Sequence, residues 1–116
     1  MAMGVDIYAA EAVLKLREKY PQIKLECAIP CETQANKWSE DWRNRYFDII
    51  RRSDVAKTLQ THYTSDCMMK RNKYMVDNSD VVIAVWNGLK SGTGNTVNYA
   101  MKSRKKVIII DPNKLR

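Results

Sequence analysis

Histidine is almost absent from this sequence, since His62, beside Tyr63 in a predicted loop, is the only one. No Ser, His and Asp set for nucleophilic catalysis can be read, and acid–base work would fall to carboxylates or lysines. Cysteine is scarce too: Cys27, Cys31 and Cys67 leave one thiol unpaired in any disulfide scheme. Tetrahedral zinc needs four ligands in close pairs, which these residues do not offer. We expect buried or idle thiols, with Cys31 the most exposed, and no metal or cofactor.

Long apolar runs are also missing. The first twenty residues lack the apolar core of a signal peptide, and no run approaches the length that crosses a bilayer. With 45% apolar and 28% charged residues, the composition is that of a globular protein. The chain has no low-complexity tract, internal repeat or Gly/Ser linker, and its 116 residues suffice for one core. We therefore expect a single cytoplasmic domain, residues 1–116, without membrane contact.

Acidic residues are outnumbered by basic ones, 13 to 20, which gives a formal net charge of +7. Such a charge favours anionic partners, nucleic acid among them. Much of the excess lies in Lys102, Arg104, Lys105 and Lys106, at the predicted end of a helix. Cations there also complement the helix dipole, so a solvated helix end explains them as well.

Apolar periodicity predicts helices and strands in alternation. The expected helices are 9–20, 37–52, 67–78 and 96–103, and the expected strands are 23–29, 55–60, 81–86 and 107–110. This order indicates βαβ units, and hence a Rossmann-like three-layer α/β domain with a parallel sheet. Ligands of such sheets bind beyond the carboxyl ends of the strands. Trp38, Trp42 and Tyr46 share one helix stripe and are read as core rather than as a base-stacking platform.

The segment 87–99 holds three of the four glycines, between a buried strand and a helix. Glycines let the backbone approach a phosphate, and the free N–H groups of a helix start bind anions. Thr93, Asn95 and Thr96 add donors, and we expect one of them to cap the helix. A plain strand-to-helix turn is the competing interpretation. Neither a P-loop nor a G-x-G-x-x-G motif is present, which disfavours ATP hydrolysis and ordinary dinucleotide binding.

A second candidate segment precedes the strand at 81–86. Arg71 and Asn72 lie near the start of the helix, on a face different from Met68 and Met75, which we expect to point inward. An arginine near strand ends can clamp a phosphate or carboxylate, and a solvent-exposed Arg in a basic helix is the alternative. With the helix-start pair Gly4 and Asp6, these segments define the candidate ligand-binding residues. They are Gly4, Asp6, Arg71, Asn72, Gly92, Thr93, Gly94, Asn95 and Thr96.

Together these segments resemble the SLOG superfamily, specifically its YpsA-like branch. The resemblance is carried by Ala2-Met3-Gly4-Val5-Asp6, by Met68-x-x-Arg71-Asn72 and by Ser91-Gly92-Thr93-x-Asn95-Thr96. It implies a Rossmann-like fold that binds nucleotides or derivatives such as ADP-ribose-type molecules. The superfamily also includes the Lonely-Guy phosphoribohydrolases and the DNA-processing Smf/DprA proteins.

One departure from the hydrolases bears on catalysis. Arg71 falls on their catalytic Arg, but Asn98 stands where they carry a catalytic Glu. An amide cannot ionise, and losing such a group removes about two to four orders of magnitude in rate. We therefore expect a sensor, carrier or sequestering protein rather than an enzyme. The alternatives are a phosphoribohydrolase-like enzyme that uses Glu11 or Asp6, and Smf/DprA-like binding of single-stranded nucleic acid.

A second departure concerns the front of the chain. The family begins with two strands before the Gly-Val-Asp segment, and here both would lie before Met1. The domain is therefore expected to lack the family's N-terminal strands. Either the chain is a fragment of a longer product or it pairs with another chain that covers the exposed strand edges. We expect a homodimer or larger homo-oligomer.

Overall fold

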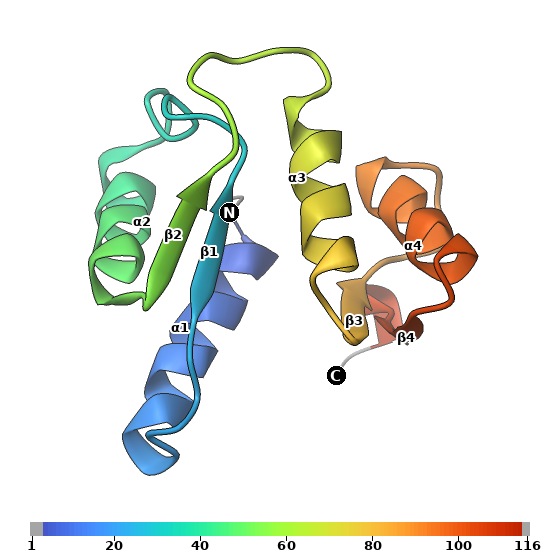
Figure 1. Cartoon of the computed structure of the whole chain (residues 1–116), viewed down its shortest axis with the longest axis horizontal. Coiled ribbons are helices and arrows are strands. Elements are labelled where there is room, and N and C mark those ends of the chain that lie inside the picture. The colour runs from blue at the N-terminus through green and yellow to red at the C-terminus, as the bar shows by residue number, and fades with distance from the viewer. Residues whose placement is uncertain (1–3, 115–116) are drawn as a thin grey trace. The chain divides into compact units, whose positions relative to one another are not determined.

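The computed structural model of the protein describes residues 4–114, in which helices and strands alternate (Figure 1). Their order along the chain is α1 (Val5–Lys19), β1 (Glu26–Ile29), α2 (Glu40–Arg52), β2 (Val55–Thr58), α3 (Cys67–Asp77), β3 (Val81–Val85), α4 (Gly92–Lys102), β4 (Lys106–Ile110) and the 3-10 turn η1 (Pro112–Lys114). The predicted α/β class and Rossmann-like build are confirmed. No helix of the described residues is long and apolar enough to cross a membrane.

The described strands form two parallel pairs. In one pair Glu26 lies opposite Val55, and in the other Val81 lies opposite Lys106. The predicted parallel direction is confirmed. The four described strands form two separate two-stranded sheets, however, rather than one hydrogen-bonded sheet. The chain divides into two compact units, an N-terminal unit up to Cys67 and a C-terminal unit from Met68. A single domain over residues 1–116 stays a prediction.

The core of the N-terminal unit lies between α1, α2 and β1. Its buried members are Ile7, Ala10, Leu14, Cys27, Ala35, Tyr46 and Ile49. The tryptophans Trp38 and Trp42 pack against this cluster, which confirms that these aromatic residues belong to the core. Trp38 lies before α2, however, because the helix begins at Glu40 and not at residue 37. Helix α2 begins where the Ser39 hydroxyl accepts the N–H of Trp42 at 3.5 Å. It carries acidic residues in its first turn and basic residues in its last, as the helix dipole favours.

In the C-terminal unit α4 packs on both strands. Val97 and Ala100 of α4 are buried, as is Ala84 of β3. Helix α3 is tied to α4 by the Tyr99 hydroxyl, which donates to Asp77 at 2.7 Å. This bond, together with burial, raises the pKa of Tyr99. The Lys73 ammonium lies 5.4 Å from the centre of the Tyr99 ring, a cation–π distance.

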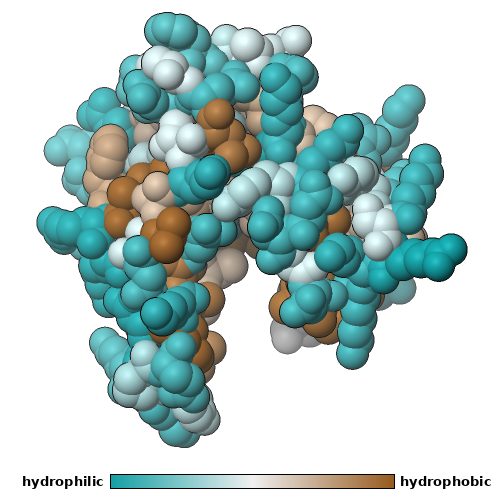
Figure 2. Space-filling model, viewed as in Figure 1, coloured by the Kyte–Doolittle hydropathy of each residue, from teal (hydrophilic) through white to brown (hydrophobic). Residues whose placement is uncertain are grey.

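One face of the β3–β4 pair is apolar and exposed. Ile83 and Ile108 are directly paired and therefore point to the same face; they are 65% and 42% exposed. Val81, two residues from Ile83, shares this face and is 44% exposed. Figure 2 shows hydrophobic atoms at the surface where β3 lies in Figure 1. Parallel strands are normally covered on both faces, so this face is unusual.

Three expectations about single residues are wrong. Met68 and Met75 are 37% and 42% exposed, and the buried residues of α3 are instead Cys67, Arg71 and Val76. Arg71 and Met75 share a face, because residues four apart in a helix lie one turn above each other. Cys31, expected to be the most exposed thiol, is 2% exposed, although buried thiols as such are confirmed.

Candidate functional site

The predicted phosphate loop is in fact the first turn of α4, which begins at Gly92 rather than at residue 96. Its cap is Ser91, not one of the three side chains expected to serve. The Ser91 hydroxyl accepts the N–H of Gly94 at 3.1 Å, and the Ser91 carbonyl accepts that of Asn95 at 3.0 Å. The Thr96 hydroxyl donates to the Gly92 carbonyl at 2.9 Å. A serine cap favours the helix enough to offset two glycines, which alone had indicated a loop.

Two backbone donors remain at this helix start. The first N–H groups of a helix have no acceptor inside it. Within residues 4–114, no hydrogen bond engages the N–H of Gly92 or Thr93, and both residues are exposed. Together with the positive end of the helix dipole, they provide the chemistry that binds an anionic oxygen.

A cavity of about 510 Å³ lies at the carboxyl ends of β3 and β4. Its lining consists of Trp86, Asn87, Gly88, Ile109, Ile110, Asp111 and Lys114. The N–H of Trp86 donates to the carbonyl of Ile110 at 2.9 Å, which continues the strand pairing into the residues that line the cavity. Its volume falls within the range of small-molecule sites.

Trp86 connects this cavity with the start of α4. Its indole N–H donates to the Leu89 carbonyl at 2.8 Å, which fixes the ring. The ring lies against Gly94, where an added Cβ would be 3.1 Å from the ring carbon Cζ2 and 3.3 Å from the Leu89 carbonyl oxygen. A side chain at position 94 would therefore require the Trp86 ring or Leu89 to shift, and Trp86 is a residue common to the cavity lining and the surroundings of the helix start.

The Arg71 side chain is buried: only 5% of the residue is exposed. The interpretation as a solvent-exposed arginine in a basic helix is therefore wrong. One guanidinium nitrogen, Nη1, donates to the sulfur of Met75 at 3.1 Å. Arg71 does not line the cavity at the strand ends, and neither does the neighbouring Asn72. Their convergence with the start of α4 on one ligand stays a prediction.

The remaining predicted residues, Gly4 and Asp6, lie at the start of α1. Gly4 is its N-cap with a φ of 82°, a conformation that favours glycine, and Asp6 lies in the first turn. Of the residues that carried the family resemblance, Ala2 and Met3 fall outside the described part of the chain. Gly4 and Asp6 meet the needs of a helix start, and a role in ligand binding stays a prediction.

Glu11, a carboxylate considered for catalysis, is bound by Arg45. The guanidinium donates from Nε at 3.0 Å and from Nη2 to the second carboxylate oxygen. This pairing lowers the pKa of Glu11, which makes it a poor proton acceptor. The Arg45 guanidinium also lies 4.8 Å from the Trp42 ring centre and 5.2 Å from that of Tyr8. Within the described residues, no group of three or more His, Cys, Asp or Glu is placed to hold a metal.

The sequence reasoning missed the cavity residues. Asp111 and Lys114 follow the strand expected at 107–110 and were not among the candidate residues. The available signal was the rule that ligands bind beyond the carboxyl ends of parallel strands. Applied to both neighbouring strands, it singles out the residues after Val85 and after Ile110, which are directly paired.

Comparison with known proteins identifies the family of the chain. The sequence matches the family described as YspA SLOG over residues 1–115. The chain belongs to this family. It is 34% identical over 114 residues to the uncharacterized SPbeta prophage-derived protein YoqJ of Bacillus subtilis, covering 88% of this chain and 67% of that protein.

Further relatives of this SLOG chain are UPF0398 proteins. That of Brevibacillus brevis is 31% identical over 93 residues, covering 78% of this chain and 50% of the relative. That of Halalkalibacterium halodurans is 28% identical over 106 residues, covering 90% and 56%. The chain thus spans about half to two thirds of the length of these relatives.

Proposed function

We propose that this SLOG chain binds a nucleotide or a nucleotide-derived ligand, as a sensor, carrier or sequestering protein. The observation that carries the proposal is the position of Trp86, which is shared by the strand-end cavity and the start of α4. One ligand would place an anionic group on the N–H groups of Gly92 and Thr93 and a flat group in the cavity. Nucleotides and ADP-ribose-type molecules combine these two parts.

Charge supports the proposal. The net charge of +7 attracts anions, and Lys114 stands at the cavity. Arg71 is a second proposed cation for the ligand, because a buried guanidinium is rare in proteins without a specific role. Two observations favour binding over hydrolysis. Asn98 stands where the related hydrolases carry a catalytic Glu, and the carboxylate of Glu11 is paired with Arg45.

The test is thermal unfolding with AMP, ADP-ribose, NAD and cyclic AMP. A ligand at one hundred times its dissociation constant stabilises the fold by about 2.7 kcal/mol. In a domain of this size, we expect the melting temperature to rise by about 10 °C. No shift with any of these ligands contradicts the proposal.

The helix start can be tested by a matched pair at Gly92. Gly92→Pro removes one N–H, and proline is tolerated at the first helical position, where the preceding Ser91 already has the extended backbone that proline requires. Gly92→Ala keeps the N–H, and its Cβ would meet nothing within 4 Å. We expect the proline variant to lose most of the ligand-induced shift and the alanine variant to keep it. Equal shifts in both variants would exclude this anion position.

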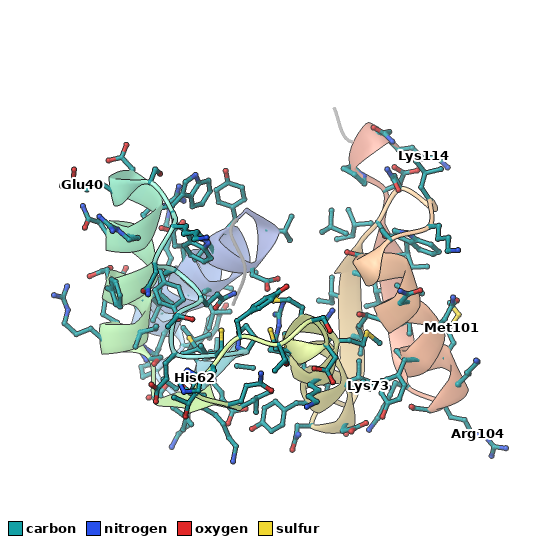
Figure 3. All side chains as sticks on the ribbon, turned by 90° about the horizontal axis from the view of Figure 1, so that it is seen from above. Glu40, His62, Lys73, Met101, Arg104 and Lys114 are labelled. Atoms are coloured by element: carbon teal, nitrogen blue, oxygen red, sulfur yellow. The ribbon has the colours of Figure 1, made fainter. Side chains whose placement is uncertain are left out.

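Because Arg71 is buried, its alanine variant is tested beside the more conservative lysine variant. Arg71→Ala and Arg71→Lys should both reduce the ligand-induced shift, since neither keeps the bidentate guanidinium. Lys105→Ala is the control. It follows the C-terminal end of α4, and Figure 3 shows the neighbouring Arg104 at the end of the C-terminal unit opposite Lys114. Equal losses in the Arg71 and Lys105 variants would indicate a general charge effect.

Single-stranded nucleic acid is a second candidate ligand, supported by the exposed Lys102, Arg104 and Lys106 at one end of the C-terminal unit. Binding there would weaken steeply with salt, since each phosphate contact releases counterions. A titration of an oligonucleotide at 50 and 200 mM salt separates it from nucleotide binding, which we expect to depend on Gly92 rather than on these cations.

A further inference from the structure

We infer that the cavity at the ends of β3 and β4 holds a purine base and selects guanine over adenine through Asp111. This inference rests on the proposed function and deepens it by naming the base. It is carried by the residues that line the cavity, whose side chains form an asymmetric set of donors and acceptors: the carboxylate of Asp111, the amide of Asn87 and the ammonium group of Lys114.

The apolar part of the lining suits a flat ring. Trp86, Ile109 and Ile110 come from the ends of two paired strands and line the cavity. Trp86 and Ile109 lie on the same face of the pair, because Ala84 is registered against Ile109 and Trp86 follows Ala84 by two residues. Bases stack on aromatic and aliphatic side chains, and this contact tolerates any base. The walls therefore explain why a base enters the cavity, and the polar groups must decide which base it is.

Asp111 is an acceptor with a fixed orientation. Its Oδ1 accepts the N–H of Asn113 at 2.9 Å, and its carbonyl accepts the N–H of Lys114 at 3.1 Å. These two bonds hold the residue at the start of the η1 turn. An ionised carboxylate offers about four acceptor positions on its two oxygens, so the bond to Asn113 leaves acceptor capacity for a ligand.

Asn87 contributes donors. Its Oδ1 accepts the N–H of Leu89 at 3.0 Å, so the amide is oriented and its Nδ2 donors are the part left to bind a ligand. Lys114 adds a third donor group on the same lining. The cavity therefore presents one strong acceptor, Asp111, and two donor side chains, Asn87 and Lys114.

Guanine has the complementary edge. Its N1–H and N2–H₂ are adjacent donors that a carboxylate binds together, and its O6 is an acceptor for an amide or ammonium donor. Adenine instead places an acceptor, N1, beside its single amino donor, so a carboxylate would face an unfavourable lone pair. A hydrogen bond to a charged group is also the stronger kind. Asp111 therefore discriminates between the two purines.

Calorimetric titration of the full chain with GMP, AMP and XMP tests the inference. We expect GMP to bind about 10- to 100-fold more tightly than AMP, as two hydrogen bonds to a charged acceptor imply. Asp111→Asn keeps an oxygen for the Asn113 N–H and replaces one acceptor by a donor. It should lose this preference and gain affinity for XMP, whose extra carbonyl accepts from the new amide.

Asp80→Asn is the matched control. It removes the same charge just before Val81, at the amino end of β3, and should leave all three affinities unchanged. Circular dichroism and melting of the variants without ligand verify that they fold.

Each other outcome is decisive. Equal affinities for GMP and AMP that Asp111→Asn leaves unchanged would overturn base selection while nucleotide binding stands. Asp111→Asn could instead lower the affinities for GMP and AMP equally and leave those for their 2′-deoxy forms unchanged. The carboxylate would then bind the ribose, and the inference would be refuted. Binding of none of the nucleotides would defeat the proposed function itself, and the guanine preference with it.

Discussion

Replacing Gly94 by alanine adds one methyl group at a position where the structure leaves almost no space. The new Cβ would stand 3.1 Å from Cζ2 of Trp86 and 3.3 Å from the Leu89 carbonyl oxygen. These two neighbours are bound to each other, because the indole N–H of Trp86 donates to that same carbonyl at 2.8 Å. Neither can retreat without weakening this hydrogen bond.

The expected free-energy change follows from two opposing terms. Alanine in place of glycine favours a helix by about 1 kcal/mol. Overpacking a tight contact costs about 1–3 kcal/mol. We therefore expect Gly94→Ala to lower the free energy of unfolding by about 1 kcal/mol, the difference between these terms. In a chain of this length, that lowers the melting temperature by about 4 °C.

Gly92→Ala, two residues earlier in the same turn, is the control. Its Cβ would meet no atom within 4 Å, so only the favourable term applies and the melting temperature should rise. Urea and thermal unfolding of the two variants give the comparison. A third measurement, Gly94→Ala in a Trp86→Leu background, should show a smaller loss, since the rigid ring is gone. Stabilisation by both alanines would refute the argued contact.

Other predictions concern sites away from the cavity. Arg104 has a φ of 60°, so Arg104→Gly should stabilise the chain by about 1 kcal/mol in urea unfolding, whereas Arg104→Ala should not. Because pairing with Arg45 lowers the pKa of Glu11, this pair stabilises the fold above the ordinary value of 4.5, and the contribution is lost as the pH falls through the lower folded pKa. Glu11→Gln should therefore destabilise at pH 7 more than at pH 2 in a series of melts. Self-association should appear in sedimentation equilibrium at tens of micromolar and weaken in Ile83→Lys, and a 13.5 kDa monomer throughout would contradict it. Thiol reagents should modify the three buried cysteines only slowly without denaturant, and fast modification of Cys31 would contradict its burial.

The order of the elements and the parallel pairing could be predicted because both follow from local apolar patterns. Val81–Val85 and Lys106–Ile110 are short runs rich in β-branched residues, and the helices between strands imply crossovers. The helix starts were harder to predict. Glycine-rich segments resemble loops, and only the hydrogen bonds of the Ser91 cap show that α4 begins at Gly92.

The candidate site was predicted only in part, for a reason of geometry. Sequence motifs follow the chain, so they made 92–96 a candidate segment but could not indicate the groups that approach from the next strand. Asp111 faces the same cavity as Trp86 because Val85 is registered against Ile110, which no local pattern reveals. Arg71 illustrates a different case: its motif drew attention to the residue, whereas its burial depends on packing that the sequence does not show.

The strand pairing also has a consequence for how the chain folds. Glu26 pairs with Val55 and Val81 with Lys106, so each parallel pair closes over about a quarter of the chain. The entropy of loop closure rises with the length of the closed segment, and folding is faster where contacting residues are close in sequence. Because a chain is synthesised from its N-terminus, both strands of the pair β1–β2 exist before β3 has been synthesised. Its pairing therefore does not have to wait for the synthesis of the residues that line the cavity.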